Sequence, residues 1–220
     1  RVTKNEHVID LDTRSLISVR YKRITKAVNQ TFWNSISDTA HSFYVGSYGR
    51  GTAINTSDLD VLIELPDAEY NHFSNIYGNG PSRLLQSVKN AILDTYPRTD
   101  IRGDGQVVVI EFSRYTVELV PGFKQADGRF KYPDTNNGGS WKYTDPLPEQ
   151  DTCQESDNNS NGIYFDFCHI LRKWKNEQGF KFGGLLIDTL VHDHFEDNEF
   201  YKDSSIDDYF DILKNLFSYL

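Results

Sequence analysis

A glycine-serine turn between two short apolar stretches limits how this chain can fold more than any other feature. Residues 43–45 (FYV) are aromatic and β-branched and predict a strand, and Gly46-Ser47 follows them directly. Residues 59–65 (LDVLIEL) predict a second strand. Side chains alternate along a strand, so Asp58 and Asp60 are expected on one face. The glycine allows a ligand to approach the backbone closely, so the pattern predicts a bound anion beside two carboxylates.

The residue types in this pattern suit a triphosphate and divalent cations. Backbone N–H groups of the turn and the Ser47 hydroxyl can donate to phosphate oxygens. Mg²⁺ prefers oxygen ligands shared with phosphate, and a site for two ions needs about three carboxylates. Glu118, in an otherwise apolar predicted strand, is the preferred third ligand, and Glu111 is the alternative. Pairing of either glutamate with an arginine such as Arg114 would be a purely structural explanation.

The order of strand, Gly-Ser turn, Asp-x-Asp and strand resembles that of the polymerase β-like nucleotidyltransferases. Further stretches are similar to the bacterial relatives of cyclic GMP-AMP synthase, the CD-NTases of the SMODS type. The resemblance covers nearly the whole chain and is carried by residues 20–26 with Phe32-Trp33, 105–123, 132–146, and 172–175 with 184–190.

The resemblance implies an α+β fold with a mixed sheet, an N-terminal spine helix and a C-terminal helical lobe. It implies a template-independent enzyme that uses Mg²⁺, or Mn²⁺, and joins nucleoside triphosphates into a cyclic oligonucleotide. In the family this second messenger activates an effector protein during phage infection, a CBASS-like defence. The expected roles are Asp58, Asp60 and Glu118 as catalytic metal ligands, with Gly46, Ser47, Arg172 and Lys175 binding the donor triphosphate.

Other functions and roles stay open at this stage. The nucleotide could be transferred to RNA, an antibiotic or a protein, or the chain could be a nucleotide-binding scaffold without turnover. Tyr48 and Arg50 suit contact with phosphate or base as well as they suit support of the turn. Trp141 could line a ligand site or anchor a loop. The histidines are scattered, and the stretch His192-Asp193-His194, which has no partner at metal spacing, is interpreted as surface.

Composition narrows the class of protein. The chain has 220 residues, 38% of them hydrophobic, which is enough for a core. It has no run of 18 apolar residues, and residues 1–10 lack the apolar stretch of a secretion signal. With its two cysteines at no metal-ligand spacing, it is expected in the cytoplasm and away from membranes. A net charge of −9 makes long nucleic acid an unfavourable partner.

Periodicity predicts strands in the first half and helices in the second. We expect a nucleotidyltransferase lobe over residues 1–150 and a helical lobe over 151–220 that is incomplete at its C-terminus. The chain contains no methionine, which indicates that an initiator is omitted. The expected elements are helices at about 13–36, 81–96, 163–177, 183–195 and 205–219, strands at 107–112 and 116–120 besides the two above, and a loop at 122–150.

Overall fold

The computed structural model describes residues 9–55 and 58–219, which form two compact units. The sheet unit comprises Asp10–Gly46 and Asp58–Pro146. The helical unit comprises the described residues of 1–9, 47–57 and 147–220. Each unit is therefore assembled from separate stretches of sequence. Residues 1–8, most of the polar stretch at positions 1–10, lie outside the described residues.

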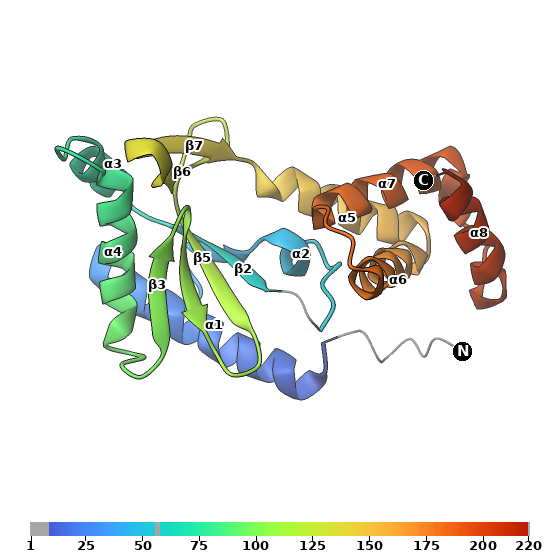
Figure 1. Ribbon diagram of the computed structural model, residues 1–220, viewed down its shortest axis with the longest axis horizontal. Helices are drawn as coiled ribbons and strands as arrows, with labels where there is room; N and C mark the ends of the chain where they lie inside the picture. The colour runs from blue at the N-terminus through green and yellow to red at the C-terminus, as the bar shows by residue number, and fades with distance from the viewer. Residues whose placement is uncertain (1–8, 56–57, 220) are drawn as a thin grey trace. The chain divides into compact units, whose positions relative to one another are not determined.

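The sheet unit is built on a mixed sheet of seven strands (Figure 1). Five strands follow the order β1-β2-β5-β4-β3, and β6 and β7 continue from the end of β5. The neighbours β2 and β5 are parallel, whereas the other pairs are antiparallel. The strands are β1 (Ser42–Tyr44), β2 (Leu59–Glu64), β3 (Asp100–Asp104), β4 (Val107–Glu111), β5 (Thr116–Lys124), β6 (Phe130–Asp134) and β7 (Ser140–Thr144).

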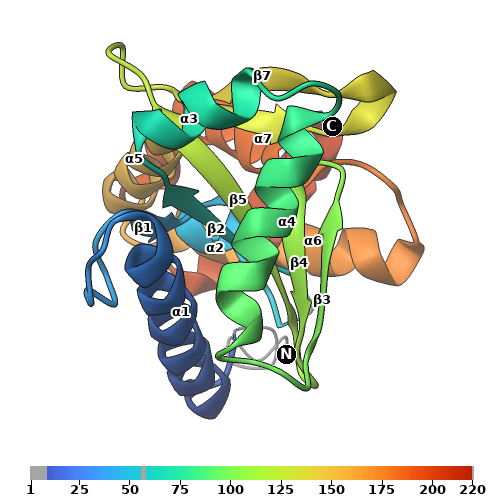
Figure 2. The same ribbon diagram turned by 90° about the vertical axis from the view of Figure 1, so that its left-hand side faces the viewer.

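Two helices, α1 (Leu11–Phe32) and α4 (Gly80–Leu93), pack together against the sheet, as Figure 2 shows. A Cβ built on Gly103 of β3 would lie 3.2 Å from Cβ of Leu85 on α4, so this face of the sheet meets the helix. Gly103 is in register with Val108, which is in register with Leu119. Side chains alternate between faces, so the neighbouring positions, Glu118 among them, face away from α4.

Local chemistry sets the ends of these helices. Asp10 caps α1 by accepting the Thr13 N–H at 2.8 Å, so the helix begins slightly before the predicted start. Asn34, with a φ of 49°, follows its end, which comes before the predicted Ile36. Asn79 caps α4 in the same way, with Ser82 N donating at 2.9 Å.

The prediction of a loop over residues 122–150 is wrong. This stretch contains the end of β5, the β6–β7 hairpin and the start of α5 (Pro146–Asn159). Its many Gly, Pro and Asn residues are typical of turns, but Phe130 pairs with Thr144 and is buried. Trp141 of β7 packs against Tyr70, with ring centroids 5.0 Å apart. Tyr70 belongs to α3 (Asp67–Ser74), a helix that the sequence analysis missed.

The helical unit packs α5, α6 (Ile163–Gln178), α7 (Gly184–Asp197) and α8 (Tyr209–Tyr219) around one apolar core. The predicted helices at 163–177, 183–195 and 205–219 are confirmed, the last with a short 3-10 turn (Ile206–Asp208) before α8. His194 is buried at 4% exposure, so its interpretation as a surface residue is wrong. The core residues are Cys153, Ile163, Tyr164, Phe167, Cys168, Leu171, Ile187, Val191, Phe195, Ile212 and Leu216.

No helix within the described ranges, 9–55 and 58–219, is long and apolar enough to cross a membrane.

Candidate active site

Two of the three predicted carboxylates lie side by side on the sheet. Asp60 of β2 is in register with Glu118 of β5, and these strands are parallel neighbours. In-register residues of adjacent strands present their side chains on the same face. Both are half-buried, on the face that points away from α4. The pairing of strands that are more than fifty positions apart in the sequence thus brings together two acidic residues.

Gly46 leaves room for one of these carboxylates. A Cβ built on Gly46 would lie 1.9 Å from Asp60 Oδ2, a distance that no real side chain could keep. The residue also has a φ of 58°, in the left-handed region that glycine adopts most easily. Val45 N donates to the carbonyl oxygen of Asp60 at 2.9 Å, which holds the two backbones together. Glycine is therefore required here by backbone conformation and by the position of Asp60.

The surroundings of Glu118 are acidic. Burial raises the pKa of its carboxyl group, and the charges of Asp58 and Asp104 raise it further. Asp58 is exposed and directly precedes β2, and Asp104 is exposed at the end of β3. The ionised form of Glu118 is thus disfavoured by its neighbours, and a bound cation would relieve this repulsion.

The three predicted metal ligands do not form a ready-made metal site. Among the described residues, no group of three or more His, Cys, Asp or Glu side chains is close enough to hold a metal ion. Their chemistry nevertheless suits Mg²⁺, because carboxylate oxygens are its preferred protein ligands. An ion would have to draw the side chains of Asp58, Asp60 and Glu118 together, and their role as ligands stays a prediction.

The alternative ligand, Glu111, has a different partner from the one considered. It is exposed at the end of β4 and forms an ion pair with Arg102 of β3, at 2.5 Å. The Arg102 guanidinium also lies 3.5 Å from Asp100. Glu111 thus takes part in a cross-strand pair on the surface of the sheet, of a kind that contributes little to stability.

The Gly-Ser turn forms a single helical turn, α2 (Gly46–Gly49). Gly51 N donates to the carbonyl oxygen of Tyr48 at 3.2 Å, and Thr52 N donates to that of Ser47 at 2.9 Å. The backbone therefore folds back on itself over residues 47–52. Ser47 itself is half-buried.

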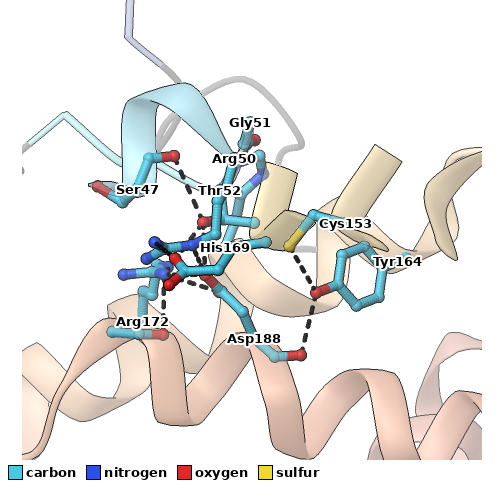
Figure 3. Close-up of polar contacts among 11 residues, drawn as sticks. Ser47, Arg50, Gly51, Thr52, Cys153, Tyr164, His169, Arg172 and Asp188 are labelled. Carbon is cyan, nitrogen blue, oxygen red and sulfur yellow. Dashed lines mark hydrogen bonds and ion pairs between the residues drawn. The ribbon is translucent and has the colours of Figure 1, made fainter. Parts of the chain in front are cut away.

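A buried ionic cluster lies behind this turn, within the helical unit (Figure 3). The carboxylate of Asp188 on α7 accepts from Arg50 Nε at 2.8 Å, from Thr52 Oγ1 at 3.0 Å and from Arg172 Nη2 at 2.7 Å. Arg50 Nη1 donates to Glu149 Oε2 at 2.9 Å. Burial acts to lower the pKa of Arg50, but the hydrogen bond and charge of Asp188 outweigh it and the pKa is raised. Of the two roles considered for Arg50, the structure shows support of the turn.

Helix α6 contacts Gly51, the residue between Arg50 and Thr52. His169 Nε2 lies 3.2 Å from the carbonyl oxygen of Gly51, to which the neutral ring can donate (Figure 3). Burial lowers the pKa of His169, which favours the neutral ring. The ring of Phe165 fills the space that a side chain at position 51 would take, since a Cβ there would lie 2.8 Å from Phe165 Cζ.

The two predicted basic residues of α6 have different surroundings. Arg172 is buried, and besides Asp188 its Nη2 donates to Thr52 Oγ1 at 3.0 Å and to the Gly184 carbonyl oxygen at 2.9 Å. Lys175 is half-buried, and its Nζ lies 5.6 Å from the centre of the Phe182 ring. Their contact with a triphosphate stays a prediction.

Sequence reasoning gave no role to Asp188 or Asp104. Asp188 interrupts the apolar run Leu185–Leu190, and a lone carboxylate in such a run signals a buried partner. That signal was present in the sequence, but it did not identify the partners. Asp104 stands beside Gly105 in what reads as an ordinary turn, so nothing in the sequence marked it.

Comparison with known proteins places this arrangement in a family. Residues 3–157 match the model of the Second Messenger Oligonucleotide or Dinucleotide Synthetase domain, SMODS. The chain belongs to the SMODS family. A probable cyclic nucleotide synthase of Bacillus cereus is 24% identical to this SMODS chain over 145 residues, which are 63% of the chain and 42% of the relative. A cyclic AMP-AMP-AMP synthase of an Acinetobacter species is 23% identical over 158 residues, 70% of the chain and 46% of the relative.

Solved structures confirm the fold predicted for this SMODS chain. The CdnC protein of Escherichia coli MS115-1, solved with ATP, matches with a TM-score of 0.69 and 15% identity, over 99% of this chain and 69% of that one. The Elizabethkingia meningoseptica CdnE cyclic dinucleotide synthase, solved with GTP and Apcpp, matches with a TM-score of 0.62 and 17% identity, over 94% and 76%. The fold is thus the polymerase β-like fold of the CD-NTases. The SMODS chain spans less than half the length of the two curated relatives.

Proposed function

We propose that the protein is a nucleotidyltransferase that joins nucleoside triphosphates into a cyclic oligonucleotide. The observation that carries this proposal is the in-register pair of Asp60 and Glu118 beside Gly46. Membership of the SMODS family supports it, as do the names of the two curated relatives, both cyclic nucleotide synthases. ATP, GTP or another triphosphate would be the substrate, since solved structures with this fold hold ATP or GTP.

The proposed reaction moves a nucleotidyl group between two nucleotides. A ribose hydroxyl of the acceptor attacks the α-phosphorus of the donor, a new P–O bond forms, and the bond to pyrophosphate breaks. Two Mg²⁺ ions, or Mn²⁺, would supply charge stabilisation and ease loss of the hydroxyl proton. Asp58, Asp60 and Glu118 would hold them, because Asp60 and Glu118 are in register and the charge of Asp58 raises the pKa of Glu118.

The donor triphosphate is assigned to the turn. Gly46 and Ser47 would bind it through backbone N–H groups and the serine hydroxyl, with positive charge from Lys175 and Arg172. Lys175 is the more accessible of the two, whereas the guanidinium of Arg172 is engaged by Asp188. Tyr48 adjoins Ser47 and is a further residue within reach of a nucleotide held there.

The wider role follows from the family resemblance. The cyclic product would act as a second messenger on a downstream effector in CBASS-like defence against phage. Such an activity would belong in the cytoplasm, where nucleoside triphosphates are available. Long nucleic acid is an unfavourable partner for a chain with a net charge of −9.

Product analysis tests this proposal. The protein is incubated with Mg²⁺ and the four nucleoside triphosphates, and the products are treated with phosphatase and analysed by mass spectrometry. A phosphatase-resistant product with the mass of a cyclic oligonucleotide is expected. Label that appears instead in RNA, a small molecule or a protein would establish the alternative transfer reaction. Nucleotide binding without any product, unchanged in both Asp58→Asn and Asp60→Asn, would leave only the nucleotide-binding scaffold.

A further inference from the structure

A single buried carboxylate, that of Asp188, contacts the segment that follows the Gly-Ser turn. The side chain of Asp188 is 1% exposed and accepts hydrogen bonds from Arg50 and Thr52, two residues of the segment that follows the turn. It also pairs with Arg172, whose Nη2 donates to the Thr52 hydroxyl at 3.0 Å. Thr52 is itself fully buried. Its hydroxyl therefore lies between an acidic and a basic partner, and its position is fixed by both.

Thr52 in turn contacts Ser47, the residue predicted to bind phosphate. Thr52 N donates to the carbonyl oxygen of Ser47 at 2.9 Å, and Thr52 Oγ1 lies 3.4 Å from the same oxygen. The path from Asp188 to the backbone of Ser47 thus passes through one residue. A shift of Thr52 would move the peptide group of Ser47 with it.

The composition of this cluster indicates a role besides stability. Replacement of a buried ion pair by apolar residues is often neutral or stabilising, so such a cluster is weak evidence for stability alone. Here the buried charges contact Arg50 and Thr52, and His169 and Phe165 of α6 lie against Gly51 between them. These contacts fix the conformation of three consecutive residues rather than fill a core.

We propose that Asp188 is a positioning residue, which through Arg50 and Thr52 holds Ser47 in the conformation that binds the donor triphosphate. This inference rests on the proposed function, because it assigns Ser47 to the nucleotide. It does not require Asp188 to touch a substrate.

Thr52→Val is the primary test, since it removes the hydroxyl and keeps the shape of the side chain. Thr52→Ser, which keeps the hydroxyl, is the conservative partner. Thr25→Val is the matched control: Thr25 is also fully buried, and its hydroxyl bonds to Ser42 at 2.8 Å in the sheet unit. Both valine variants lose one buried hydroxyl, and Thr52→Val should lose the more stability because the partners of Thr52 are charged.

Hydrogen–deuterium exchange without nucleotide tests the positioning itself. We expect exchange in the peptide covering residues 46–53 to become at least fivefold faster in Thr52→Val, and to be unchanged in Thr52→Ser and Thr25→Val. Equal exchange of this peptide in Thr52→Val and Thr25→Val would overturn the proposal. This measurement needs no turnover, so it stands even if the protein makes no nucleotide product and the proposed function fails.

Kinetics with Mg²⁺ and nucleoside triphosphates test the consequence. The KM for the donor should rise about tenfold in Thr52→Val, equivalent to ~1.4 kcal/mol, with kcat within twofold of the unchanged protein. Thr52→Ser should restore the KM, and a purely structural residue would not separate KM from kcat in this way. Asp188→Asn should raise both exchange and KM further. If it fails to fold, the Thr52 variants decide, and a KM equal to that of Thr25→Val contradicts the assignment.

Discussion

Replacement of Gly46 by alanine tests whether the position of Asp60 matters for the reaction. The new Cβ would lie 1.9 Å from Asp60 Oδ2, whereas real Cβ atoms keep at least 3.0 Å. The carboxylate or the backbone must therefore move by about 1 Å, and a misplacement of that size can cost ~100-fold in rate. We expect kcat/KM for the nucleotide to fall by about this factor, a barrier increase of ~2.7 kcal/mol.

Backbone strain adds a separate cost, for which the chain offers a control. Gly46 has a φ of 58°, and alanine in this region costs roughly 1–2 kcal/mol. Gly105 has nearly the same φ, 57°, but the nearest atom to its built Cβ is 3.9 Å away. Gly105→Ala thus introduces the strain without displacing Asp60.

Both variants are compared by thermal unfolding and by Mg²⁺-dependent turnover of nucleoside triphosphates. Each should lower the Tm by about 2–4 °C for every kcal/mol of strain in a chain of this size. Only Gly46→Ala should lose most of its activity. If the two variants lose the same activity, or if Gly46→Ala keeps full activity, the position of Asp60 beside Gly46 has no part in the reaction.

Three other substitutions or measurements follow from the described contacts. Glu118→Gln should abolish transfer yet raise the Tm at pH 7 in metal-free buffer. The raised pKa of Glu118 stabilises the fold fully below the ordinary glutamate pKa, and this stabilisation is lost as the pH rises through the raised pKa. The gain should vanish below about pH 4, and a lower Tm at pH 7 would contradict this reading. Gly184→Ala would place a Cβ 2.2 Å from Arg172 Nη1 and should cost about 1–3 kcal/mol in urea unfolding, whereas Gly183→Ala, with no atom within 4 Å, should cost far less. Cys168 is fully buried and its thiol pKa is raised, so disulfide reagents at pH 8 should modify it only as fast as the protein unfolds.

The sequence predicted the elements whose signals are local. Helix α4 has an apolar stripe, a capping Asn79 and Pro81 in its first turn, and the predicted helix lies close to the observed one. The strands β2 and β4 are short apolar runs that needed no distant partner to be recognised. In these segments the local preference and the fold agree.

The missed elements depend on contacts between distant residues. Strand β6 contains Pro133 and follows Gly128, features that predict a turn, yet Pro133 pairs with Trp141 of β7. The Trp141 ring packs on Tyr70, more than seventy positions earlier. Such packing stabilises a hairpin that local composition disfavours, and it is not visible in a short window of sequence.

The candidate site also contains residues that local sequence identifies and residues that depend on distant contacts. Asp58, Asp60 and Glu118 were identified by spacing, residue type and family resemblance, but the register that sets Asp60 beside Glu118 comes from the sheet. Asp188 was missed because its partners Arg50 and Thr52, in the segment after the turn, lie 138 and 136 positions away. A pattern of neighbours along the chain cannot reveal a partner at that separation.

The separation between the turn and its anchor also has a consequence for biosynthesis. A ribosome adds roughly 5–20 residues per second, so Asp188 emerges on the order of ten seconds after Thr52. Until α6 and then α7 have emerged, the nascent turn lacks its contact with His169 and its acid partner Asp188. A product that ends before α7 would contain Gly46 and the carboxylates of the sheet, but its turn would not be anchored. The proposed reaction would therefore require translation through α7.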